Sequence, residues 1–167
     1  MTDSTTPRVP LRVLFVCTGN ICRSPTAEGV FRHLVIQEGL EEKVIVDSAG
    51  TQGYHAGAQP DRRSMLAAAR RGYDLSMLRA RALSDTDFSE FDYILAMDRD
   101  HLMILESSAP SEGREKIAMM LDFSPRYGGN EVPDPYYGGP QGFEHVLDLI
   151  EDGATGLLAD VKRKLGT

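Results

Sequence analysis

One short segment combines a thiol, a cation and residue types that tolerate unusual backbone angles. It follows an apolar run and reads Cys17-Thr18-Gly19-Asn20-Ile21-Cys22-Arg23-Ser24. Gly19 and Asn20 are the types that most readily adopt left-handed backbone angles, which a loop needs if its N–H groups are to converge. Arg23 offers a planar fork that can bind two phosphoryl oxygens at once. The segment therefore predicts a cradle for an oxyanion, with a cysteine at its start.

Cys17 is the candidate nucleophile of this cradle. A loop between a strand and a helix points N–H groups and the positive end of the helix into one concavity. Thiols in such a place, or beside cations, ionise more readily than free thiols. We therefore expect Cys17 to be a thiolate at neutral pH and to attack a bound phosphorus atom. Ser24 could donate a hydrogen bond to the same sulfur.

The two cysteines and the glycines also allow other interpretations. A small protein often buries its cysteines as apolar residues. Cys17 and Cys22 could supply two ligands of a zinc site, which needs about four. The chain has no further cysteines and only four scattered histidines, so a second pair of ligands is missing and zinc is not expected. No G-x-x-x-x-G-K-[ST] motif occurs, and no G-x-G-x-x-G follows the first apolar run, so a nucleotide is not expected. We expect neither a metal nor a cofactor.

Strands and helices alternate along the chain. Short apolar runs predict strands at 11–16, 44–46, 93–97 and 117–121. Helical spacing and cap signals predict helices over 24–38, 60–71, 98–107 and 143–165. Ser24-Pro25 resembles an N-cap followed by proline at the first helical position. Two glycines, Gly153 and Gly156, weaken the last helix by about 1 kcal/mol each relative to alanine.

This alternation predicts an α/β fold. We expect one domain with a four-stranded, mainly parallel sheet, helices on both faces and the phosphate-binding loop after the first strand. In such sheets ligands bind beyond the carboxyl ends of the strands, where the strand order reverses. Residues 1–10 are expected to be a flexible tail, and residues 11–167 the domain.

Charge and hydropathy exclude several function classes. The chain has 167 residues, a formal net charge of −7 and a pI of about 5.1, which argues against nucleic acid as a partner. No run approaches the ~18 apolar residues of a membrane span, and the first ten residues contain no apolar signal segment. We therefore expect no membrane association, and a cytoplasmic protein with free thiols.

The segment from Val16 to Pro25 closely resembles the signature of the low-molecular-weight protein tyrosine phosphatases. Three other segments match that family in order. Residues 47–51 resemble its serine loop, 92–98 its third strand and following turn, and 132–138 its general-acid loop. The resemblance covers roughly residues 11–166. A C-x5-R motif joined to an acidic loop at this distance is far more specific than the motif alone.

The resemblance implies a role for each matched residue. Cys17 attacks phosphorus and forms a cysteinyl-phosphate, while Arg23 and the loop N–H groups hold the equatorial oxygens. Asp134 protonates the departing tyrosyl oxygen and then acts as base on the attacking water. Asn20 and Ser48 hold the shape of the loop. The loop residues implied to contact substrate are Thr18, Gly19, Asn20, Ile21, Cys22 and Ser24.

Further matched positions bear on specificity and regulation. Tyr54 matches one aromatic wall of the substrate pocket, and Tyr136 and Tyr137 match the opposite wall. Ile21 favours phosphotyrosine, because family members that act on phosphoarginine carry threonine there. A disulfide between Cys17 and Cys22 would protect the nucleophile from over-oxidation. One departure is Met77, which stands where the family has a histidine that supports the serine loop. Asp98 is expected to cap a helix.

Three rival functions stay open at this point. A protein arginine phosphatase would use the same loop. An arsenate reductase shares fold and loop, but its relay needs a further cysteine pair that this chain lacks. A non-catalytic phosphotyrosine-binding module would be expected to lack the nucleophile or the acid. The expected partners are phosphotyrosine proteins or peptides, with inorganic phosphate and similar oxyanions as inhibitors, and the expected state is a monomer or weak dimer.

Overall fold

Four parallel strands form one sheet in the computed structural model, which describes residues 9–135 and 139–167. The strands are β1 (Leu11–Cys17), β2 (Val44–Gly50), β3 (Tyr93–Ala96) and β4 (Ile117–Met119). Their order is β2-β1-β3-β4, and each neighbouring pair is parallel. The predicted sheet is thus confirmed. β2 runs further than predicted, and β4 is shorter because the 3₁₀-helix η2 (Met120–Phe123) begins directly after it.

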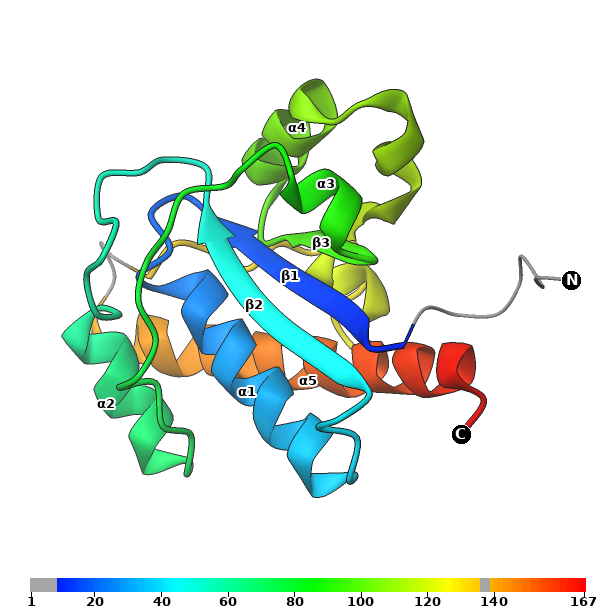
Figure 1. Cartoon of the computed structure of the whole chain (residues 1–167). Coiled ribbons are helices and arrows are strands. Elements are labelled where there is room, and N and C mark those ends of the chain that lie inside the picture. Colours follow the sequence, from blue (N-terminus) through cyan, green and yellow to red (C-terminus); the bar gives the residue numbers. More distant parts are fainter. Residues whose placement is uncertain (1–8, 136–138) are drawn as a thin grey trace, which may run out of the picture.

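Helices cover both faces of the sheet (Figure 1). Helices α1 (Arg23–Gln37) and α5 (Pro140–Leu165) pack on one face, and α2 (Arg62–Arg70) lies against both of them. Helix α4 (Arg99–Ser108) packs on β3 and β4. The short helix α3 (Asp87–Glu90) and the 3₁₀-helix η1 (Ser111–Lys116) complete the described elements.

Strand β1 is the centre of the core, because its side chains alternate between two apolar clusters. Val13, Phe15 and Cys17 face the cluster that includes residues of α1 and α5. Leu14 and Val16 face the other cluster, with residues of α3 and α4. Both faces of β1 are buried, which explains why its sequence is a continuous apolar run rather than an alternating one.

The strand order also fixes where a ligand can bind. The chain passes from β1 to β2 on one side and later returns to place β3 on the other side of β1. The carboxyl end of β1 is therefore the point at which the strand order reverses, where open α/β sheets bind ligands. Cys17 is the last residue of β1.

None of the helices in the described part of the chain is both long and apolar enough to span a membrane.

Candidate active site

The loop after β1 has the left-handed residue that the sequence predicts, at one of the two expected positions. Asn20 has a φ of 59°, whereas Gly19 has no positive φ. A Cβ at Gly19 would lie 2.9 Å from Cδ2 of His55, so the exposed ring of His55 would have to shift to admit a side chain there. Asparagine tolerates the left-handed region better than most side chains, and helix α1 begins three residues later, at Arg23.

Ser24 is not the N-cap that its sequence position indicated. Helix α1 begins one residue earlier and Cys22 precedes it, so Ser24 lies inside the first turn. Its backbone N–H has no partner within the helix there and donates to Sγ of Cys17 at 3.4 Å. Its Oγ lies 2.9 Å from the same sulfur. A backbone N–H and a hydroxyl group of one residue therefore converge on the Cys17 sulfur.

Asn20 fixes the direction of these hydrogen bonds. Its Nδ2 donates to Oγ of Ser24 at 2.8 Å and to Oγ of Ser48 at 2.9 Å, while its Oδ1 accepts from the backbone N–H of Arg81 at 3.0 Å. Oγ of Ser48 in turn donates to Oε1 of Glu28 at 2.6 Å. Burial raises the pKa of Glu28, although the Ser48 hydroxyl acts against this rise. The two residues predicted to shape the loop, Asn20 and Ser48, are thus directly bonded.

Support for the serine loop comes from Arg81 rather than from position 77. The guanidinium of Arg81 binds Oδ2 of Asp47 and Oδ2 of Asp87, each at 3.0 Å. Met77 is 82% exposed, so the residue predicted to replace a supporting histidine makes no such contact. Nothing in the sequence singled out Arg81, because its partners lie up to 61 positions away along the chain.

Arg23 is buried, and two hydrogen bonds fix the orientation of its guanidinium group. Its Nη1 donates to Oδ2 of Asp98 at 2.8 Å and to the carbonyl of Val132 at 3.0 Å. Asp98 caps α4 as predicted, since its Oδ1 accepts from the N–H of His101 at 2.9 Å. Burial opposes ionisation of this carboxyl, but the bonds from His101 and Arg23 outweigh it and lower the pKa of Asp98. The pairing of Asp98 with Arg23 was not predicted.

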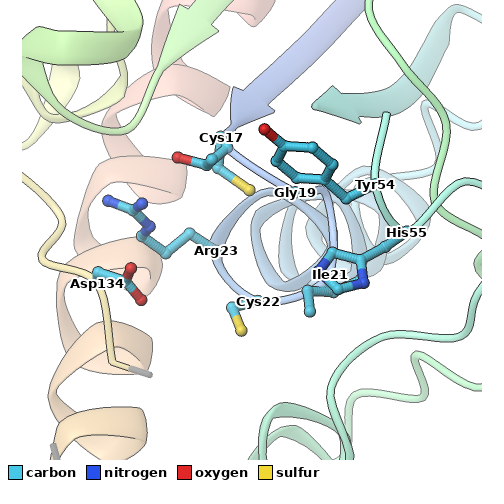
Figure 2. A pocket seen from close by; sticks show the side chains of 9 residues that line it. Cys17, Gly19, Ile21, Cys22, Arg23, Tyr54, His55 and Asp134 are labelled. Carbon is cyan, nitrogen blue, oxygen red and sulfur yellow. The ribbon is translucent and has the colours of Figure 1, made fainter. Parts of the chain in front are cut away.

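These elements enclose a cavity of about 260 Å³ at the carboxyl end of β1. Figure 2 shows Arg23 and Asp134 on one side of it and Tyr54 and His55 on the other, with the sulfur of Cys17 between them. The lining residues are Cys17, Thr18, Gly19, Ile21, Cys22, Arg23, Tyr54, His55 and Asp134.

The structure thus separates the candidate site residues into two groups. The predicted nucleophile, cation and acid all line one cavity, together with Tyr54, which is 80% exposed. Asn20, Ser24 and Ser48 are buried outside the lining, so their side chains shape the loop. Tyr136 and Tyr137 lie outside the described residues. His55 was not predicted, because an exposed histidine in a loop gives no sequence signal.

Cys22 lines the same cavity but differs chemically from Cys17. Burial raises its pKa to about 12, and the negative charge of Asp61 contributes. Both cysteines are free thiols in the structure. Within residues 9–135 and 139–167, no three or more His, Cys, Asp or Glu side chains are grouped so that they could hold a metal ion.

Comparisons with known proteins agree with this geometry. Residues 12–166 match the family model described as low molecular weight phosphotyrosine protein phosphatase. A putative low molecular weight protein-tyrosine-phosphatase of Synechocystis is 47% identical, over 93% of this chain and 99% of its own length. The crystal structure of a protein tyrosine phosphatase from Entamoeba histolytica, with Hepes in the active site, has 43% identity and a TM-score of 0.89, covering 92% of this chain and 97% of that one.

A third relative is named for a different specificity. The crystal structure of DARP, the Drosophila arginine phosphatase, has 33% identity and a TM-score of 0.83, and the match covers 91% of this chain and 98% of that one. The fold therefore does not by itself separate the two specificities. The family match spans nearly the whole chain, and we conclude that this protein belongs to the low molecular weight phosphotyrosine protein phosphatase family.

Proposed function

We propose that this chain hydrolyses phosphotyrosine through a cysteinyl-phosphate on Cys17, with Arg23 binding the phosphoryl group and Asp134 acting as general acid and base. The family is one of cysteine-dependent protein tyrosine phosphatases, which are phosphoric monoester hydrolases. The observation that carries the proposal is the convergence of the Ser24 N–H and hydroxyl groups on the Cys17 sulfur, in the cavity that Arg23 and Asp134 also line.

The first half-reaction transfers the phosphoryl group to sulfur. The Cys17 thiolate attacks phosphorus, the S–P bond forms and the bond from phosphorus to the tyrosyl oxygen breaks. Asp134 gives its proton to that departing oxygen. Arg23 and the loop N–H groups stabilise the charge on the three equatorial oxygens. Asp98 and the Val132 carbonyl bind Nη1 of Arg23, so the edge formed by Nη2 and Nε remains for the phosphoryl oxygens.

The second half-reaction regenerates the enzyme. Water attacks phosphorus, Asp134 as a carboxylate accepts the proton of that water, and the S–P bond breaks. Inorganic phosphate leaves and Cys17 is again a thiolate. Because the leaving sulfur accepts hydrogen bonds from Ser24, the same contacts favour both halves of the cycle. Inorganic phosphate and similar oxyanions should accordingly inhibit the enzyme by occupying the loop.

Specificity for phosphotyrosine rests on the cavity walls. Tyr54 and Ile21 both line the cavity, and an aromatic wall suits a phenyl ring. Ile21 stands where family members acting on phosphoarginine carry threonine.

We propose phosphotyrosine-containing proteins or peptides as the partners, a monomer or weak dimer as the working state, and a reducing cytoplasm as the setting. Cys22 lines the same cavity as Cys17, which supports the proposed protective disulfide under oxidising conditions.

The test compares hydrolysis of matched peptides that carry phosphotyrosine, phosphoserine or phosphoarginine, with EDTA present. The proposal expects turnover of phosphotyrosine, its loss in Cys17→Ser, and little turnover of the other two. Preference for phosphoarginine would keep the Cys17 mechanism but overturn the assignment to Ile21 and Tyr54. Absence of any turnover by folded, reduced protein would overturn the catalytic proposal in favour of a binding module.

A further inference from the structure

His101 is a buried residue next to the loop after β1, residues 17–24, which we call the phosphate loop. It lies in the first turn of α4 and is 2% exposed. Its ring reaches the loop after β1, where Nε2 lies 2.8 Å from Oγ1 of Thr18. Thr18 lines the cavity directly after Cys17. A buried imidazole is therefore bonded to a side chain of the candidate phosphate site, and the catalytic steps described above do not use it.

The other ring nitrogen faces the partner of Arg23. Nδ1 of His101 lies 3.0 Å from Oδ1 of Asp98, although without the alignment of a hydrogen bond. Among the described residues, Nδ1 of His101 stands out as a fully buried side-chain nitrogen without a hydrogen-bond partner. The other oxygen of the same carboxylate, Oδ2, accepts from Nη1 of Arg23. One carboxylate therefore lies against both the ring and the phosphate-binding cation.

The positions of the ring hydrogen follow from charge. Burial, with the charge of Arg23 as the next cause, lowers the pKa of His101 to about 4, so the ring is neutral at physiological pH. Asp98 is ionised, and a ring lone pair facing its oxygen at 3.0 Å would be repelled. We therefore assign the single ring hydrogen to Nδ1, which leaves Nε2 to accept the hydroxyl hydrogen of Thr18.

We propose that His101 is a positioning residue for phosphate binding. It holds Thr18 of the phosphate loop in a fixed position relative to the Asp98–Arg23 pair. The Thr18 hydroxyl gives its hydrogen to His101, so its side chain is held against α4 and the loop backbone stays free to bind oxygens. This inference rests on the proposed phosphate site. It predicts that loss of the ring weakens oxyanion binding while leaving the nucleophile and the acid in place.

The experiment measures binding of inorganic phosphate by titration calorimetry, together with kcat and KM for a phosphotyrosine peptide. His101→Leu should weaken phosphate binding and raise KM about tenfold, since a buried hydrogen bond is lost and its partner left unsatisfied. His101→Gln, which can still accept from Thr18 and donate toward Asp98, should restore most of the affinity. His33→Leu removes a ring on α1 outside the cavity lining, and it should leave binding unchanged.

A double-mutant cycle separates positioning from general support of the fold. Thr18→Val removes the hydroxyl and keeps the shape, so combining it with His101→Leu should add little further loss of affinity. Additive losses, or full phosphate affinity in folded His101→Leu, would overturn the inference. If His101→Leu does not fold, Thr18→Val still decides, because a Thr18→Val protein that binds phosphate as tightly as the unmodified protein contradicts the inference. Failure of the unmodified protein to bind phosphate would instead overturn the proposed function.

Discussion

The hydroxyl oxygen of Ser24 lies 2.9 Å from the sulfur of Cys17, and a thiolate at that position can only accept the hydrogen of this bond. Nδ2 of Asn20 already donates to that oxygen at 2.8 Å. The hydroxyl hydrogen is therefore directed to the sulfur rather than to the distant Ala49 carbonyl, which lies 3.5 Å away. The orientation of Asn20 is fixed in turn by the Arg81 N–H that its Oδ1 accepts. The chain of hydrogen bonds thus ends on the nucleophile with a donor.

Replacing Ser24 with alanine should slow the enzyme without removing its nucleophile. The thiolate loses a hydrogen bond to a charged group, and we expect kcat to fall about 10- to 100-fold. Alkylation of Cys17 by iodoacetamide near pH 6 should slow as well. Ser107→Ala, which removes an exposed hydroxyl on α4, is the matched control and should change neither rate. An unchanged alkylation rate in Ser24→Ala would mean that the hydroxyl does not stabilise the thiolate.

The two cysteines should differ sharply in reactivity although they line one cavity. Burial first, and then the charge of Asp61, raises the pKa of Cys22 to about 12, and a raised thiol pKa means that the neutral form persists at all lower pH values. Iodoacetamide at pH 7 should therefore label Cys17 and leave Cys22 unlabelled, as measured by peptide mass spectrometry. Cys17→Ser should take up almost no label. Comparable labelling of Cys22 would contradict the buried, neutral thiol described here.

The sequence was sufficient for the sheet and for the position of the loop. The apolar run of β1 and the Gly-Asn pair after it carry local information, since a buried strand and a left-handed residue each have their own residue preferences. The N-cap assigned to Ser24 was wrong for a physical reason. Serine before proline signals a helix start whether its oxygen caps the helix or contacts a thiol, and only the fold distinguishes the two.

The connections behind the loop could not be predicted, because they join residues far apart in the chain. Arg23 meets Asp98 across 75 positions, and Thr18 meets His101 across 83. No local pattern records such pairs. The room available for a side chain cannot be predicted from the sequence either. From the sequence, Gly153 and Gly156 of α5 are alike, since each weakens a helix. The structure separates them, because a Cβ at Gly156 would lie 1.6 Å from the carbonyl oxygen of Phe123.

Gly156→Ala should accordingly destabilise the protein although alanine favours helices. The added methyl group meets a backbone atom that cannot rotate away, and we expect a loss of about 3 kcal/mol or more in the free energy of unfolding. At Gly153 a Cβ would lie 3.1 Å from Cδ2 of Leu121, the end of a side chain that can shift. Gly153→Ala should therefore stay within about 1 kcal/mol of the unmodified protein. Urea unfolding measures both, and equal effects would contradict this distinction.

His101 should also make stability depend on pH below neutrality. Burial and Arg23 lower its pKa from 6.5 to about 4, while Asp98, Asp100 and Asp134 act in the opposite direction. Between these pH values His101 is protonated in the unfolded chain but neutral in the folded chain. The free energy of unfolding therefore falls by roughly 3 kcal/mol as the pH drops from about 6.5 to about 4. His101→Gln lacks this group, and its unfolding free energy should fall less over the same interval. Glu28, whose pKa is raised, titrates in both proteins and cancels in the difference. Parallel pH curves for the two proteins would show that His101 is not held neutral by the fold.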